Sequence, residues 1–224
     1  MDFNRCFEKH DFNELNNLDI YILNNAVLQF IKLYNNNNNN NIIFDVGANA
    51  GSFIKVLNHY NLINNIHCFE PHPVLSNKTK EIYPFIKMNN YCLSNMIGTI
   101  DINIPMWSVG LSSIINRPIF DKLKNEGQHI TKINVKCETL DYYCKQNNIE
   151  EIDFIKIDVE GAEKMIFEGS TEMLKNKKIK CGLFEIGETL KDAGTNEKEI
   201  CELLKGYGYN IDKTVSNNDY FFYK

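Results

Sequence analysis

Two acidic residues in this chain each accompany an apolar run that reads as a strand. The first run contains Asp45 and leads into a turn with Gly47 and Gly51. The second run ends at Glu70, which is followed directly by Pro71. Glycines let a ligand approach the backbone closely, and an acid at the end of the next strand can accept hydrogen bonds from a ribose diol. The pattern predicts a site for a nucleoside-containing cofactor at the carboxyl ends of parallel strands.

The spacing of the glycines narrows the choice of cofactor. A dinucleotide fingerprint reads Gly-x-Gly-x-x-Gly, because its third glycine lets a helix N-terminus meet a pyrophosphate. Here Gly47 and Gly51 are separated by three residues with Asn49 in the middle, so the pyrophosphate signature is missing. A ligand with a ribose and no phosphate fits better, and S-adenosylmethionine is the one we expect. A plain strand–turn–helix needs the same glycines, but it does not need Glu70.

A second group of acids lies late in the chain. A strand-like run ends at Asp158, and Glu160 and Glu163 follow within five residues. Acids in the first turn of a helix are favoured by the helix dipole, so capping is one explanation. Together with Lys156, however, these are too many charges for one cap. Ligands of open α/β sheets bind at strand ends, so we expect the charges to hold a substrate or tune a proton.

Alternating strand and helix patterns position these residues. Ser52 and Thr139 are predicted helix caps, and two alternating segments near the middle predict an antiparallel pair inserted beside the sheet. The βα alternation with an antiparallel end predicts a three-layer αβα sandwich with a mostly parallel sheet. The predicted strands are 42–46, 65–70, 85–93, 98–104, 130–137, 153–157, 180–186, 209–212 and 220–223, and the predicted helices are 52–60, 73–82, 139–146, 162–167 and 197–205.

The N-terminal part has a different composition. Residues 12–34 repeat apolar side chains at helical spacing, and the asparagine run that follows reads as a connector. We therefore expect a short N-terminal helical extension with its connector over residues 1–41 and one catalytic-type domain over residues 42–224. The apolar stripe of the extension is suited either to a homodimer contact or to covering the cofactor.

Length, charge and cysteine content limit the classes of protein to which this chain can belong. With 224 residues the chain can bury one sizeable core. A net charge of −5 and a pI near 5.6 disfavour a nucleic-acid partner, because such proteins usually carry a basic face. Seven cysteines without a paired pattern indicate a reducing compartment and neither disulfides nor zinc. No signal peptide or membrane-spanning run is visible, so we expect a cytoplasmic protein without a membrane partner.

At this point the sequence resembles the FkbM-type methyltransferases, a branch of the S-adenosylmethionine-dependent class I fold. The resemblance extends over roughly residues 42–212 and implies a Rossmann-like, seven-stranded methyltransferase sheet. It also implies transfer of a methyl group to a hydroxyl, typically of a sugar or a natural product. The matching segments are 44–51, 69–73, 110–113, 139–141 and 153–163, with Glu185 after a later strand.

The resemblance also implies roles for individual residues. Glu70, followed by Pro71, would bind both ribose hydroxyls. Asp158 would lie nearest the transferred methyl, with Glu160 and Glu185 lining the acceptor side. The methionine and ribose parts of the cofactor would be surrounded by four residues of the first turn, Asp45, Gly47, Asn49 and Gly51. The adenine would be contacted by two residues after the third strand, Leu93 and Ser94.

Methyl transfer to a hydroxyl needs a positioned nucleophile and a proton acceptor. We predict that Asp158 is this base and that Glu160 or Glu185 orients the acceptor. Two alternatives are weaker. Oxygen ligands at Asp158 and Glu185 would suit magnesium or calcium, but no ligand motif accompanies them, so we expect no metal. His72 or His129 could act instead, since the histidine pKa lies near working pH, but neither stands in a catalytic pattern.

The acceptor class stays open at this level. A sugar or glycan hydroxyl is the favoured acceptor, and a polyketide-like or lipid molecule is the main alternative. Ribose methylation of RNA is disfavoured by the acidic balance, and a non-catalytic nucleoside-binding module would not need the late acids. Trp107 is expected to pack in the core, although a sugar ring could stack on it. The acceptor pocket should come from residues 104–130, where the resemblance is weakest.

Overall fold

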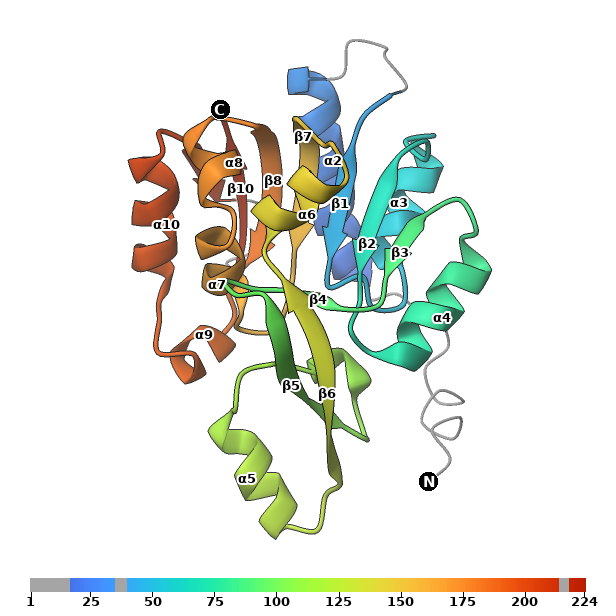
Figure 1. Ribbon diagram of the computed structural model, residues 1–224, viewed down its shortest axis with the longest axis vertical. Helices are drawn as coiled ribbons and strands as arrows, with labels where there is room; N and C mark the ends of the chain where they lie inside the picture. Colours follow the sequence, from blue (N-terminus) through green and yellow to red (C-terminus); the bar gives the residue numbers. More distant parts are fainter. Residues whose placement is uncertain (1–16, 35–39, 214–217) are drawn as a thin grey trace.

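The computed structural model describes residues 17–34, 40–213 and 218–224. Its centre is a seven-stranded sheet in the order β3-β2-β1-β7-β8-β10-β9 (Figure 1). The five strands from β3 to β8 run parallel, and β10 is antiparallel to both of its neighbours. The bounds are β1 Ile43–Val46, β2 Ile66–Phe69, β3 Lys87–Asn89, β7 Ile152–Ile157, β8 Ile179–Glu185, β9 Asn210–Lys213 and β10 Asp219–Tyr223. The predicted fold class is confirmed.

Helices cover both faces of this sheet. Successive strand residues point to opposite faces, so Ile43 and Phe154 pack on one side while Phe44 and Ile155 pack on the other. The first side is covered by α2 (Asn17–Tyr34) and α3 (Ser52–His59). The second side is covered by α6 (Leu140–Gln146), α7 (Glu163–Glu168), α8 (Thr171–Lys175) and α10 (Glu197–Gly206). The result is the expected three-layer sandwich.

A smaller sheet is inserted between β3 and α6. It contains β4 (Cys92–Leu93), β6 (Ile130–Glu138) and β5 (Gly98–Pro105) in that order, and β5 and β6 form the predicted antiparallel pair. Between β5 and β6 lie a 3-10 turn, η1 (Val109–Leu111), and α5 (Pro118–Asn125). Figure 1 shows β5, β6 and α5 extending away from the main sheet. The segment between β5 and β6, residues 106–129, is called the insertion below.

Some predicted elements need correction. Residues 85–93 do not form one strand, because the chain turns after Asn89 and β4 joins β6 in the other sheet. Ser52 is not the cap of α3; the cap is Gly51, which has a left-handed φ of 86° and makes no side-chain cap bond. The predicted cap of α6 is confirmed, since Thr139 accepts a bond from the Tyr142 N–H at 3.1 Å.

Helix α4 (Pro73–Ile82) begins and ends at the predicted residues. Helix α5 was not predicted; it has eight residues, and Phe120 is the only one of its side chains that is buried. The short helices α8 and α9 (Thr189–Asp192) were not predicted either.

Helix α2 belongs to the core of the main sheet. Its residues Ala26, Val27 and Phe30 are fully buried in the same cluster as Phe154 and Phe221. The predicted helical residues 12–16 lie outside the described part of the chain, and dimerisation through this extension stays a prediction. Within the described residues, none of the helices combines the length and apolar content that crossing a bilayer requires.

Candidate active site

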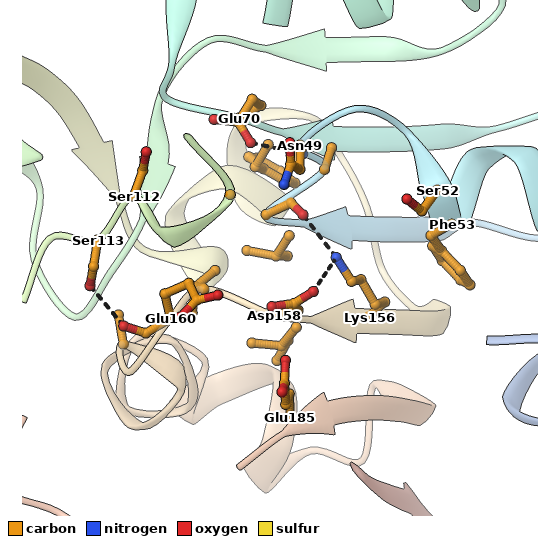
Figure 2. Close-up of a pocket in the computed structure, with 18 of the residues that line it drawn as sticks. Asn49, Ser52, Phe53, Glu70, Ser112, Ser113, Lys156, Asp158, Glu160 and Glu185 are labelled. Atoms are coloured by element: carbon orange, nitrogen blue, oxygen red, sulfur yellow. Dashed lines mark hydrogen bonds and ion pairs between the residues drawn. The ribbon is translucent and has the colours of Figure 1, made fainter. Parts of the chain in front are cut away.

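A cavity of about 450 Å³ opens where the parallel strands of the main sheet end. Its floor comes from residues at or just beyond the ends of β1, β2, β7 and β8, and residues 108–114 of the insertion form the opposite wall. Figure 2 shows Glu70, Lys156, Asp158, Glu160 and Glu185 grouped around this space. A volume of this size is typical of small-molecule sites. The structure therefore brings Glu70 and the late acids of the sequence into one cavity.

The glycine turn after β1 is forced by a close approach of two loops. Gly47 has a φ of 79°, and a Cβ at this position would lie 1.9 Å from the Asp158 carbonyl oxygen. Gly47 lines the cavity. Gly51, which was also predicted to bind the cofactor, does not line it. Gly51 instead allows the left-handed turn into α3, and a Cβ there would lie 2.7 Å from the Tyr83 ring. Its role is conformational.

Glu70 is held with both carboxylate oxygens in fixed positions. Oε2 accepts a hydrogen bond from the Asn49 N–H and Oε1 accepts one from the His72 N–H, each at 2.8 Å. The side chain lines the cavity and is 6% exposed. Burial raises the pKa of Glu70 to about 7, against the two backbone donors, which lower it. Because each carboxylate oxygen can accept a second hydrogen bond, the site is suited to a pair of ribose hydroxyls.

His72 has a structural role. It is the N-cap of α4, and its Nδ1 accepts bonds from the Val74 and Leu75 N–H groups at 3.2 and 3.4 Å. The ring is fully buried, and burial lowers its pKa. Neither His72 nor His129 lines the cavity, so the geometry does not favour the histidine alternative. Trp107 does not line it either and is 38% exposed, so the prediction that it packs in the core was wrong.

Lys156 organises the floor of the cavity. Its ammonium donates to the Gly47 carbonyl at 2.8 Å and lies 3.4 Å from Asp45 Oδ1 and 3.2 Å from Asp158 Oδ2. Burial alone would lower the pKa of Lys156, but the two carboxylates raise it above its ordinary value. The lysine stays charged and ties β1 to the end of β7. A lysine inside the apolar β7 run was the sequence signal for this role.

Asp45 lies beneath the cavity. It was predicted to surround the cofactor, but it is fully buried, is not among the lining residues and faces Lys156. Burial raises its pKa and Lys156 lowers it. Its contribution to the site is therefore indirect, through the lysine that contacts both Gly47 and Asp158.

Three acids line the side of the cavity away from Glu70. Asp158 and Glu160 follow β7, and Glu185 ends β8. Burial and the neighbouring Asp158 charge raise the pKa of Glu160 to about 7. Burial and the charges of Asp158 and Asp219 raise the pKa of Glu185 to about 8. Among the described residues, no group of three or more His, Cys, Asp or Glu side chains could hold a metal ion. The three carboxyl groups can accept hydrogen bonds and protons from a ligand in the cavity.

The loop between β7 and α7 is built to present these acids. Glu163 is buried, and its Oε1 accepts bonds from the Val159 N–H at 3.1 Å and from the Gly161 N–H at 3.3 Å. Burial raises the pKa of Glu163 to about 7. The loop also contains Glu160 with a φ of 54°, which is uncommon for a residue other than glycine. Glu163 thus supports the loop from below while Asp158 and Glu160 face the cavity.

The apolar part of the cavity lies beside Glu70. Pro71, Leu93 and Leu75 of α4 line it, and of these Leu93 is the residue predicted for the adenine side. Ser94 does not line it; this residue is fully buried, and its carbonyl oxygen would lie 2.1 Å from a Cβ added to Gly169. Ser94 therefore packs against the loop after α7 instead of contacting a ligand.

These features fit S-adenosylmethionine. Glu70 offers two carboxylate oxygens to a ribose diol, and Leu93 and Pro71 offer apolar contact to a base. No side chain caps α3, and Ser52 and Phe53 at its N-terminus line the cavity. A carboxylate can take the place of a cap at such a helix end. The methionine carboxylate would bind there, and the sulfonium would lie toward Asp158.

The buried acids predict how stability depends on pH. The folded-state pKa values of Glu70, Glu163 and Glu185 are raised to about 7, 7 and 8. Their protonated forms therefore stabilise the fold below the ordinary pKa of glutamate, and this contribution is lost as the pH rises through 7 to 8. We expect the Tm of the ligand-free protein to fall by about 2–6 °C between pH 6 and pH 8.5.

Thermal unfolding at both pH values tests this. The E185Q variant should show a smaller fall, whereas E81Q, a change at an exposed position of α4, should behave like the wild type. A Tm that rises between pH 6 and pH 8.5 in the wild type would contradict the burial of these carboxyl groups.

Comparisons with known proteins agree with the geometry. Residues 45–211 match the profile described as Methyltransferase FkbM domain. The 2-O-methyltransferase NoeI of Sinorhizobium fredii (strain NBRC 101917 / NGR234) is 26% identical over a match that covers 59% of this chain. The same match spans only 58% of the length of NoeI.

Two solved structures share the fold over nearly their whole length. One is a SAM dependent methyltransferase from Aquifex aeolicus, with a TM-score of 0.50 and 10% identity, covering 100% of this chain and 97% of that one. The other is a S-adenosylmethionine-dependent methyltransferase from Clostridium acetobutylicum ATCC 824, with a TM-score of 0.50 and 10% identity, covering 99% and 98%. At these identities the likeness shows the fold alone.

Proposed function

This chain belongs to the FkbM methyltransferase family, whose cofactor is S-adenosylmethionine, and we propose that it transfers the methyl group of this cofactor to a hydroxyl oxygen of a carbohydrate. The observation that carries the proposal is the position of Asp158, Glu160 and Glu185. All three line the cavity opposite Glu70, on the side toward which an acceptor can approach from the insertion. The name of the relative NoeI, a 2-O-methyltransferase, supports an oxygen acceptor.

When bound, the cofactor supplies an electrophilic methyl group on a positively charged sulfur. The protein must then hold a hydroxyl oxygen about 3 Å from that methyl and in line with the breaking bond. A hydroxyl is a weak nucleophile, so a carboxylate that accepts its proton as the new bond forms speeds the reaction. We assign this base to Asp158, because Lys156 fixes the position of its carboxylate.

Glu160 and Glu185 are assigned to orienting the acceptor. A sugar presents several hydroxyls close together. Two further carboxylates beside the base can therefore bind the hydroxyls next to the one that reacts. The wall formed by the insertion adds backbone and hydroxyl groups at Ser108 and Ser112. Hydrogen bonds of this kind suit a polyhydroxylated acceptor. The apolar residues Val109 and Ile114 on the same wall favour a polyketide-like or lipid acceptor as the second candidate.

The charge of the cavity argues against anionic acceptors. Among the described residues, Lys156 is the single cation in its lining, and its ammonium is already engaged by Gly47, Asp45 and Asp158. The lining carboxylates are Asp19, Glu70, Asp158, Glu160, Glu185 and Asp219. A phosphate group would be repelled there, so ribose methylation of RNA and methylation of sugar phosphates are both disfavoured.

An acceptor panel tests the proposal. The protein would be incubated with S-adenosylmethionine carrying a labelled methyl group and with a neutral oligosaccharide, its phosphorylated form, a phenolic polyketide and an RNA. We expect label in the neutral oligosaccharide, as a methyl ether at one of its hydroxyl oxygens. Label confined to the phenol would support the second candidate, and label in the RNA would overturn the proposal. The D158N variant serves as the matched control for non-enzymatic transfer.

The raised pKa values predict the pH dependence of turnover. Glu160 and Glu185 accept the stronger, charge-assisted hydrogen bonds from an acceptor only when they are ionised, and their pKa values are raised to about 7 and 8. We expect kcat/KM to rise with pH through this range and then to level off. In E185Q the rise should move to lower pH, and the plateau should fall by about tenfold. An unchanged acid limb in E185Q would exclude Glu185 as a group that titrates in this reaction.

A further inference from the structure

One arginine connects the insertion to the loop after β7 and to helix α9. Arg117 precedes α5, and its side chain is 14% exposed. Its Nη1 lies 3.6 Å from Glu160 Oε2, and its Nε lies 3.5 Å from Asp192 Oδ2 on α9. The guanidinium also lies over the Phe120 ring, 5.2 Å from its centroid. A single side chain of the insertion thus contacts the loop after β7 and the helix that follows β8.

The choice of arginine at this position fits its geometry. The chain has 24 Lys and Arg residues, and only Arg5 and Arg117 are arginines. A guanidinium presents its N–H groups in a planar fork and can face two carboxylates in different directions, whereas an ammonium is a compact point charge. Glu160 and Asp192 are faced by different nitrogens of Arg117. A lysine could pair with either acid but would not bridge both in the same way.

The insertion holds the backbone of Glu160 as well. Ser113 Oγ donates a hydrogen bond to the Glu160 carbonyl at 2.8 Å, and the same oxygen accepts one from the Ile115 N–H at 3.0 Å. Figure 2 shows this bond joining the insertion wall to the Glu160 loop. The left-handed conformation of Glu160 is uncommon and persists where the surroundings hold it. Ser113 fixes the main chain of Glu160, and Arg117 faces its carboxylate.

We propose that Arg117 is a positioning residue, which fixes the Glu160 carboxylate at the acceptor side of the cavity and ties the insertion wall to it. This proposal rests on the proposed function, in which Glu160 orients the acceptor. Residues 108–114 line the cavity and Arg117 lies three residues after Ile114, so the wall and the acid are assembled as one unit. Loss of Arg117 should therefore disturb acceptor binding and leave the cofactor side intact.

Electrostatics around Glu160 support this role. Burial and the Asp158 charge raise the pKa of Glu160 to about 7, and Arg117 and Lys156 act in the opposite direction. Glu185 also faces this group of acids, since the Glu160 charge contributes to the raised pKa of Glu185. Removing the guanidinium should raise the pKa of Glu160 further, so that less of it is ionised at neutral pH. A role limited to packing would not move this titration.

Two measurements test the proposal together. The first is the pH profile of kcat/KM for the wild type, R117M, R117K and the double variant R117M/E160Q. The second is the titration of the Glu160 side-chain carboxyl by NMR in wild type and R117M labelled with ¹³C glutamate, with E160Q identifying the resonance. The matched control is K124M on α5, the helix that Arg117 precedes; it removes an exposed lysine paired to Asp121 at 3.8 Å.

We expect R117M to raise the pKa of Glu160 by about one unit and to move the acid limb of the kcat/KM profile to higher pH by the same amount. On that limb kcat/KM should therefore be about tenfold lower than in the wild type. The affinity for S-adenosylhomocysteine should stay within about twofold. R117K should recover part of the loss, and R117M should cause no further loss in the E160Q background. K124M should match the wild type.

The proposal would be overturned if the losses of kcat/KM caused by R117M and E160Q multiplied in the double variant. It would also be overturned if the pKa of Glu160 were the same in R117M and the wild type. If R117M does not fold, R117Q provides the same comparison, because it also removes the positive charge beside Glu160. The NMR titration needs no acceptor, so its outcome separates the two ideas. A shifted Glu160 in a protein that methylates no hydroxyl would leave the Arg117–Glu160 coupling standing and would remove the proposed function.

Discussion

Replacing Asp158 by asparagine should lower kcat by about 10²- to 10⁴-fold while S-adenosylmethionine still binds. The amide is close in size to the carboxylate and can still accept a bond from Lys156, whose ammonium also keeps its contacts with Gly47 and Asp45. The floor of the cavity should therefore survive the change. What is lost is the group that takes the hydroxyl proton. The experiment pairs single-turnover kinetics with calorimetric titration of the cofactor.

Asp101 provides the matched control for this variant. It lies on β5, its side chain is 50% exposed, and it pairs with Lys132 at 3.8 Å. D101N therefore makes the same chemical change outside the cavity and should retain full turnover. If D158N keeps wild-type turnover, Asp158 is not the base, and the assignment passes to Glu160 or Glu185.

The second large effect is expected at Glu70. E70A removes two charge-assisted hydrogen bonds to a ribose diol, and we expect the affinity for S-adenosylhomocysteine to fall by about 100-fold or more. E70Q should lie between E70A and the wild type, because one of its side-chain atoms still accepts. Isothermal titration calorimetry with each variant gives the comparison directly.

Glu70 also accepts bonds from the Asn49 and His72 N–H groups, so E70A could disturb the turn itself. Circular dichroism and the Tm of each variant separate this effect from lost binding. E81A, at an exposed position on α4, is the control. Wild-type affinity in a folded E70A protein would show that the ribose does not bind at this carboxylate.

Much of the framework follows from local sequence patterns. The order of strands and helices after residue 42 is readable because apolar runs and turn residues alternate, and α4 even has its predicted bounds. Glu70, Asp158, Glu160 and Glu185 could be selected because they occupy strand ends, where an open sheet forms its ligand crevice. These predictions depend on the spacing of apolar residues along the chain and on where each strand ends, which are local properties of the sequence.

The predictions diverge from the structure where tertiary contacts decide the position of a residue. Asp45 and Gly51 belong to the glycine-turn motif, but the motif does not say which residues face the ligand: Asp45 lies under Lys156, and Gly51 makes the turn into α3. Ser94 is sequestered by the loop at Gly169, which is far away in the sequence. The break between β3 and β4 depends on pairing with β6, a long-range contact that no local pattern encodes.

The insertion was the least predictable region. Helix α5 has eight residues and buries only Phe120 among its own side chains, so it is a short element with little core contact. The partners of Arg117, Glu160 and Asp192, lie 43 and 75 residues further along the chain. Only the fold brings these groups together. The same holds for Lys156, whose charge inside an apolar strand was visible but whose three partners were not.

The most direct test of the central claim is a crystal structure of the protein with S-adenosylhomocysteine. We predict that both ribose hydroxyls lie within hydrogen-bond distance of the Glu70 carboxylate and that the sulfur faces Asp158, with Glu160 and Glu185 beyond it. Clear density for the ligand in another orientation, with Glu70 away from the ribose or the sulfur directed away from the three acids, would contradict the claim.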